Sequence, residues 1–248
     1  MRYDVISADC HIDLIWLPPD LFTANASAAL RERMPYVTDG PKGPKWVTRT
    51  GAEFGLVNGM GSAGREYVPG QIHRSDRMAS TGLYTDGQQG IRRLTDPDLR
   101  IRDQDRDGVQ AEVLYGILGA SMRMQDPEAA AEVIRIYNEW LADFCKAHPE
   151  RFAGLACIPN APVAFAVEEI ERVARRGGLR GLDVANAPEM PALWDPYWEP
   201  IWSASAETGL PVHFHTIGGG RPNWEHHPAQ VQRAAFAAFI TGFQLHMA

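Results

Sequence analysis

The sequence predicts an α/β fold, a TIM (β/α)8-type barrel with about five of the eight units present and a long insertion after the first strand. Short apolar runs alternate with amphipathic segments of helical length in the second half of the chain, which is typical of parallel strands joined by right-handed crossovers. Polar residues stand where these runs end, and barrel active sites are built at such strand ends. An open, doubly wound sheet is the competing interpretation.

The first expected strand is the apolar run over residues 3–8, and the segment after it differs in character. Residues 15–102 are rich in Gly, Pro and single aromatics, and their only sustained periodicity predicts a helix around residues 26–33. Long irregular stretches inside a compact domain are usually binding loops or lids. We therefore expect an insertion that covers the mouth of the barrel, within a single domain over residues 1–248.

Beyond the insertion, strand-helix units recur regularly. The periodicity and the Gly and Pro residues between segments predict four further strands, each followed by a helix. The expected strands cover residues 109–117, 152–158, 179–184 and 211–215. The expected helices cover residues 126–148, 162–176, 196–208 and 228–246. A partial barrel is favoured over an open sheet because the sequence stops within an apolar helical segment, residues 236–247.

The composition is that of a globular protein able to bury a substantial core, with 45% hydrophobic and 22% charged residues. The formal net charge of -7 argues against nucleic acid or an anionic membrane surface as the main partner. The three cysteines, Cys10, Cys145 and Cys157, are too few and scattered for a disulfide framework or a cysteine zinc cluster. With no signal-peptide core and no apolar run near the ~20 residues of a membrane span, we expect a cytoplasmic protein.

Two apolar runs end in alternating side chains that could bind a metal. Asp9, His11 and Asp13 follow the first run, and His213 and His215 end the last. Residues two apart on a strand share a face, and carboxylates and imidazoles are ligands of divalent metals. If both strands open at one face, Asp9, His11 and His215 converge there. Capping aspartates and ordinary polar histidines explain either motif alone, but the presence of both favours a metal site.

Other side chains are candidates for binding a substrate. Arginine is suited to gripping a carboxylate through a bidentate fork. The insertion offers Trp46, Arg65, Tyr67, His73, Arg74 and Arg77. Asn160 and Asp183 stand at strand ends, and His213 precedes His215 on the same strand face. From these we take Arg65, His73, Asn160 and His213 as the substrate-binding set, with an ordinary surface role as the alternative for each insertion residue singly.

Five segments, in their order and spacing, carry a resemblance to a known family. They are Asp-x-His at 9–11, Asp-Gln-Asp-Arg-Asp-Gly-Val at 103–109, Arg-Phe-Ala-Gly-Leu-Ala at 151–156, Gly-Leu-Arg-Gly-Leu at 178–182 and Gly-Leu-Pro-Val-His-Phe-His at 209–215. Along the length of the chain they resemble the amidohydrolase-related metal-dependent family. That family includes decarboxylases of the aminocarboxymuconate-semialdehyde and resorcylate type, and some hydrolases.

The resemblance implies that Asp9, His11 and His215 hold zinc or manganese. It also implies a small aromatic or unsaturated carboxylate as substrate, with decarboxylation preferred over hydrolysis of a lactone or amide. In the family a residue from the sixth strand and an aspartate from the eighth complete the site, and that aspartate transfers a proton. We expect it to lie beyond Ala248, so the catalytic residue is not assigned and the chain alone is expected to be inactive.

Two other classes of function compete with this prediction. The first is a non-catalytic fragment, because a barrel without three units leaves strand edges exposed, which favours association of copies of the chain. The second is an open-sheet nucleotide binder. The glycines at 218–220 are not followed by the Lys-Ser/Thr of a phosphate loop, which argues against nucleotide binding.

Overall fold

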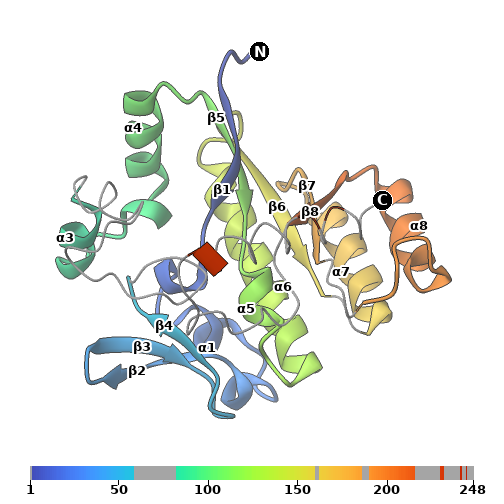
Figure 1. Cartoon of the computed structure of the whole chain (residues 1–248), viewed down its shortest axis with the longest axis horizontal. Coiled ribbons are helices and arrows are strands. Elements are labelled where there is room, and N and C mark those ends of the chain that lie inside the picture. The colour runs from blue at the N-terminus through green and yellow to red at the C-terminus, as the bar shows by residue number, and fades with distance from the viewer. Residues whose placement is uncertain are drawn as a thin grey trace.

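A parallel sheet of five strands is the centre of the fold (Figure 1). The computed structural model describes residues 2–58, 82–159, 162–185 and 190–215, together with residues 230, 231, 241 and 244. The strands are β1 (Ile6–His11), β5 (Ala111–Tyr115), β6 (Phe152–Ile158), β7 (Gly181–Ala185) and β8 (Val212–His215). They lie side by side in chain order, and each neighbouring pair is parallel. The sheet is a half-barrel of the TIM type, as predicted.

Successive side chains of these strands point to opposite faces of the sheet. Ala156 and Leu182, which are register partners on β6 and β7, are fully buried in the hydrophobic core. Asp183 and His213, the next partners along, therefore lie on the other face. The polar residues at the strand ends share this second face.

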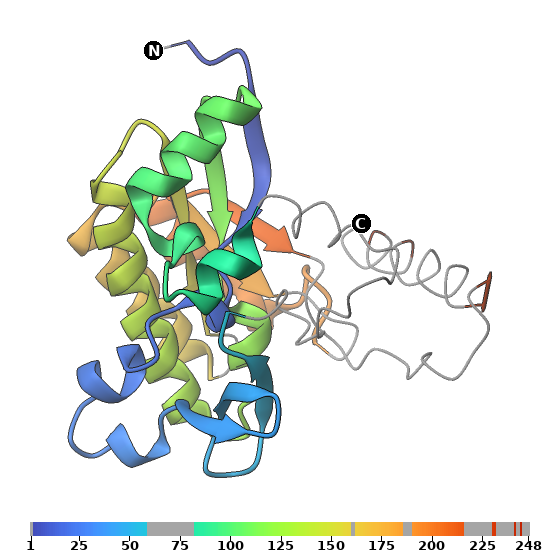
Figure 2. The ribbon, with the colours of Figure 1, turned by 90° about the vertical axis from the view of Figure 1, so that its left-hand side faces the viewer.

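Helices follow three of the strands and cover the first face. They are α6 (Pro127–Lys146), α7 (Val163–Arg176) and α8 (Glu199–Thr208). α6 and α7 pack against β6, and α8 packs against α7 (Figure 2). α6 begins where the Asp126 side chain accepts a hydrogen bond from the Ala129 amide, and the following proline suits the first turn. This cap explains why α6 begins at Pro127.

Between β1 and β5 the chain forms an antiparallel sheet that the sequence pattern does not predict. Its strands are β2 (Tyr36–Gly40), β3 (Gly43–Val47) and β4 (Glu53–Leu56), in that order. Trp46 of β3 is fully buried, with its ring edge-on to Phe22 at 5.8 Å between centroids. The expectation that Trp46 contacts a substrate is therefore wrong, because its side chain belongs to the core of the insertion.

The helix expected over residues 26–33 is wrong. Helix α1 (Leu21–Asn25) ends there because Ala26 is extended, with φ of -74° and ψ of 150°. A longer helix, α4 (Pro97–Asp107), closes the insertion, and Gly108 ends it with a φ of 74°. The remaining short elements are η1 (Leu14–Trp16), η2 (Arg31–Arg33), α3 (Leu83–Gln88), η3 (Arg93–Thr95), α5 (Leu118–Ser121) and η4 (Pro196–Trp198).

The predicted strands differ from the observed ones mainly at their ends. β6 has the predicted bounds, whereas β1 begins at Ile6 and continues to His11, so Asp9 and His11 lie within the strand. The helix expected over residues 228–246 lies outside the described part except for residues 230, 231, 241 and 244, which are helical. Among the residues the structure describes, no helix is long and apolar enough to cross a membrane.

Candidate metal centre

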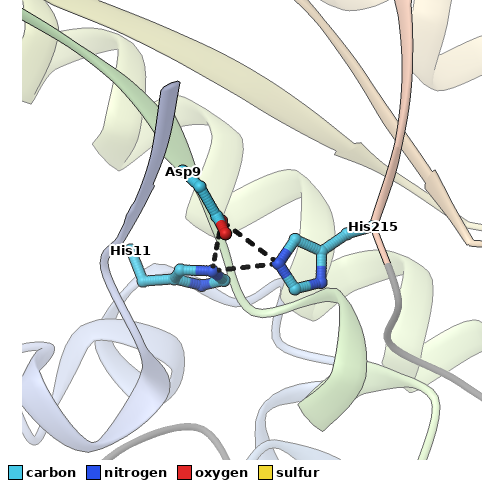
Figure 3. Close-up of side chains that lie close together, drawn as sticks. All are labelled: Asp9, His11 and His215. Atoms are coloured by element: carbon cyan, nitrogen blue, oxygen red, sulfur yellow. Dashed lines mark hydrogen bonds and ion pairs between the residues drawn. The ribbon is translucent and has the colours of Figure 1, made fainter. Parts of the chain in front are cut away.

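The side chains of Asp9, His11 and His215 meet at the carboxyl ends of β1 and β8 (Figure 3). His11 Nε2 lies 3.2 Å from Asp9 Oδ1 and 3.1 Å from His215 Nε2. His215 Nε2 lies 3.3 Å from Asp9 Oδ1. Three potential ligand atoms, from the first and the last strand of the sheet, thus form one triangle.

The spacing of this triangle fits a divalent metal ion. Ligand atoms around a tetrahedral ion with bonds of about 2.1 Å lie about 3.4 Å apart, close to the separations of 3.1–3.3 Å found here. One carboxylate and two imidazoles are a donor set that zinc and manganese accept. A neutral imidazole binds a metal through Nε2 only when Nε2 carries no proton. The one proton of the ring is then on Nδ1. His11 and His215 both have a buried Nδ1 without a hydrogen-bond partner among the described residues.

The three ligand candidates differ in their exposure to solvent. The Asp9 side chain is 72% exposed, whereas those of His11 and His215 are 25% and 19% exposed. A small molecule can therefore approach the triangle from the Asp9 side. The imidazoles form the buried side of the site.

Hydrogen bonds from three elements fix the backbone that carries His11. The Ile12 amide donates to the Tyr115 carbonyl at 3.0 Å. The His11 carbonyl accepts from Arg100 of α4 at 3.3 Å, and the Ile12 carbonyl accepts from the Tyr137 hydroxyl of α6 at 3.3 Å. The turn after β1 is therefore held by the sheet, the insertion and a core helix together, which is how a ligand is kept in place before the metal arrives.

The two histidines of the triangle have different proton affinities. Burial lowers the pKa of His11, but the carboxylates of Asp13 and Asp9 outweigh burial and raise it above its ordinary value. The pKa of His215 is lowered, first by burial and then by the neighbouring His11. A proton taken up by the metal-free site is therefore held by His11.

A buried carboxyl group lies on the same sheet face as the triangle. Asp183 of β7 is fully buried, and neither of its oxygens has a hydrogen-bond partner among the described residues. Burial raises its pKa to about 7, against a smaller lowering by His11. The sequence places Asp183 at a strand end, but nothing in a single sequence shows that its side chain has no partner.

Tyr115 is a site residue that no sequence motif marks. Its hydroxyl lies 3.3 Å from His213 Nδ1, and its ring lies 5.0 Å from the His215 ring and stacks on His11 at 5.8 Å. Burial raises its pKa, and the charges of Asp183 and Asp9 raise it further. Its position at the end of the second barrel strand is the signal that could have identified it.

Of the four candidate substrate-binding residues, the structure describes only His213. His213 lies beside Tyr115, with its pKa lowered by burial. Arg65, His73 and Asn160 lie outside the described residues, as do the further insertion candidates Tyr67, Arg74 and Arg77.

A cavity of about 460 Å³ opens at the other end of the sheet. Its lining includes Ile6, Ala111 and Phe152, which begin or lie near the beginning of β1, β5 and β6. Barrel active sites lie at the carboxyl ends of the strands. We therefore place the candidate site at the triangle and not at this cavity.

A family model matches this chain over most of its length, and curated relatives match about half of it. A family model described as amidohydrolase matches residues 8–243. The 2-amino-3-carboxymuconate-6-semialdehyde decarboxylase of Dictyostelium discoideum is 28% identical over 120 residues, which are 48% of this chain and 33% of that protein. The gamma-resorcylate decarboxylase of Polaromonas sp. is 28% identical over 125 residues, which are 48% of this chain and 38% of that protein.

Solved structures share the fold. An amidohydrolase from Mycobacterium avium subsp. paratuberculosis superposes with a TM-score of 0.63 and 19% identity, covering 96% of this chain and 62% of its own. The 5-carboxyvanillate decarboxylase of Novosphingobium aromaticivorans, with bound manganese, superposes with a TM-score of 0.51 and 22% identity, covering 70% of this chain and 53% of its own. This chain spans less than two thirds of the length of each of these proteins.

Proposed function

The chain belongs to the amidohydrolase family, and on that premise we propose that it serves in a metal-dependent decarboxylase of a small aromatic or unsaturated carboxylate. The triangle of Asp9, His11 and His215, with separations of 3.1–3.3 Å, carries the proposal. In it these three residues are the metal ligands, and zinc or manganese is the metal. The manganese in the related carboxyvanillate decarboxylase supports that choice.

A divalent cation held by these ligands supplies Lewis acidity toward the substrate's carboxylate and a neighbouring oxygen. The chain's own residues shape the surroundings of the cation. Asp9 leaves the triangle open to solvent on one side, while the rings of His11 and His215 close the other. Tyr115 and His213 extend the same sheet face, and their hydroxyl and imidazole can hydrogen-bond to oxygens of the bound substrate.

Further side chains are proposed to hold the substrate's carboxylate. Arg65 would form a bidentate pair with it, and His73 and Asn160 would donate single hydrogen bonds. The relatives named above support a carboxylate substrate, since their names describe decarboxylases of an unsaturated and of an aromatic acid.

Hydrolysis of a lactone or amide is the second candidate. The description of the family as amidohydrolase favours it, and a carboxylate-histidine metal site serves hydrolysis as well as decarboxylation. The two reactions differ in their products. Decarboxylation releases carbon dioxide, whereas hydrolysis opens a ring or cleaves an amide.

The test is a substrate panel on the complete natural protein that carries this sequence, loaded with zinc or manganese. The panel contains hydroxylated benzoates, an unsaturated semialdehyde acid, lactones and amides. We expect carbon dioxide from a carboxylate, and loss of that activity on chelation or in the His215→Ala variant. His148→Ala is the matched control, because His148 pairs with Asp98 on the surface, away from the triangle. Ring opening without carbon dioxide would favour hydrolysis, and turnover that survives chelation would reject both candidates.

A further inference from the structure

Two buried polar atoms next to the triangle face each other without a hydrogen bond. His11 Nδ1 and Asp13 Oδ1 lie 3.7 Å apart. Neither atom has a hydrogen-bond partner among the described residues. Buried polar atoms are nearly always paired, so a donor and an acceptor left over at this distance need an explanation.

Capping does not explain Asp13. It occupies the position before the short helix η1, and its backbone carbonyl accepts a hydrogen bond from the Trp16 amide. Its side chain, however, makes no hydrogen bond to that turn. The Asp13 residue is 8% exposed, so solvent does not account for the carboxylate either. The side chain is therefore available to His11.

The backbone between the two residues is already fixed. Arg100 holds the His11 carbonyl, and the Ile12 amide and carbonyl bond to the Tyr115 carbonyl and the Tyr137 hydroxyl. The remaining freedom lies in the side-chain torsions. A hydrogen bond between nitrogen and oxygen needs a separation of about 2.7–3.2 Å, so closing the gap of 3.7 Å takes a side-chain movement of about 0.5–1 Å.

We propose that Asp13 is a positioning residue for His11. Its carboxylate accepts the hydrogen on Nδ1, which leaves Nε2 unprotonated and turned toward Asp9 and His215. A carboxylate behind a metal-binding histidine fixes the tautomer and the ring orientation and makes the nitrogen a stronger ligand. The inference deepens the proposed function and rests on it, because it assigns a role within the same metal site.

The proposal predicts a difference between the two histidines of the triangle. His11 has a carboxylate behind its Nδ1, whereas His215 has no partner for its Nδ1 among the described residues. His11 is then fixed as the Nδ1–H tautomer before metal binds. The ring of His215 has no such constraint from the described part of the chain.

The experiment measures Zn²⁺ affinity by competition with a chelating dye and the tautomer of His11 by ¹⁵N NMR on the metal-free chain. The variants are Asp13→Ala, which removes the acceptor, and Asp13→Asn, which keeps a neutral acceptor. Asp39→Asn is the control, since Asp39 is exposed on β2. We expect Asp13→Ala to weaken Zn²⁺ binding by about 10–100-fold, with Asp13→Asn intermediate and Asp39→Asn unchanged. At a pH where His11 is neutral, its ring should be the Nδ1–H tautomer in the wild type and a mixture in Asp13→Ala.

The outcomes separate this inference from the proposed function. Wild-type Zn²⁺ affinity and an unchanged His11 tautomer in Asp13→Ala would reject the role of Asp13 while leaving the metal site standing. A wild-type chain that binds no Zn²⁺ would reject the metal site. The NMR comparison would then still decide whether Asp13 sets the tautomer, since it is made without metal.

Discussion

The Nε2 atoms of His11 and His215 lie 3.1 Å apart, although the two residues are separated by 204 positions in the chain. Two imidazole nitrogens at this distance, with the Asp9 carboxylate beside both, share either a proton or a cation. Because the pKa of His215 is lowered by burial and by His11, only one of the rings readily takes up a proton. A divalent cation satisfies all three ligand atoms together.

Metal binding should stabilise the folded chain, and the effect should depend on the triangle. A ligand present at about 100 times its Kd and bound only by the folded state adds about 2.7 kcal/mol to the free energy of unfolding. We expect Zn²⁺ or Mn²⁺ to raise the Tm of the wild type and of His148→Ala, but not of His11→Ala or His215→Ala. Equal shifts in all four proteins, measured by calorimetry, would mean that the metal binds elsewhere.

The strands of the parallel sheet could be predicted because each contains a short apolar run, and β6 has the predicted bounds. The antiparallel sheet β2–β4 could not, since its strands contain Gly, Pro and Lys and are held by pairing across strands rather than by a local pattern. For the site, alternation along β1 and β8 gives five ligand candidates, Asp9, His11, Asp13, His213 and His215. The resemblance to the family singles out Asp9, His11 and His215 among them. The lack of a hydrogen-bond partner for the Asp183 carboxyl within the described part of the chain depends on how side chains from distant segments pack, which cannot be predicted from one sequence.

Arg100 should contribute to the stability of the chain, and its hydrogen bond to the His11 carbonyl connects it to the metal site. Its guanidinium bonds to the Glu112 carboxylate at 2.6 Å, and the two side chains are 7% and 12% exposed. Arg100→Met leaves that buried carboxylate unpaired, which typically costs about 3–5 kcal/mol. Urea unfolding should show this loss and a partial recovery in Arg100→Met/Glu112→Gln. Arg106→Met on the same helix is the control, since Arg106 is 52% exposed. If the double variant lost as much free energy of unfolding as the two single variants together, the pairing of Arg100 with Glu112 would be contradicted.

Trp46 should contribute to stability and not to binding. Its side chain is fully buried against Phe22 in the insertion. Trp46→Ala removes a large core side chain and should lower the free energy of unfolding by about 3–5 kcal/mol. Below its own Tm, the variant should bind Zn²⁺ with wild-type affinity, as measured by dye competition. A variant with unchanged stability would show that Trp46 is not the core residue its burial indicates.

Asp183 should make the chain less stable as the pH rises from about 4 to about 7, because its pKa is raised to about 7 in the folded state and is about 3.9 in an unfolded chain. Between these values the folded state keeps a proton that the unfolded state releases, so the free energy of unfolding falls with pH. The full difference corresponds to at most about 4 kcal/mol.

The isosteric variant Asp183→Asn isolates this contribution, since both proteins keep every histidine. Urea unfolding with a chelator present should give similar stabilities at about pH 4. At about pH 8 the variant should be the more stable protein, because the wild type then carries a buried carboxylate without a partner. Stabilities that change in parallel with pH would show that Asp183 is ionised and satisfied in the folded chain. If Asp183→Asn is more stable at about pH 8 and also binds Zn²⁺ more weakly than the wild type, the buried carboxyl belongs to the metal site. Residues that are kept at a cost to stability are typical of functional sites.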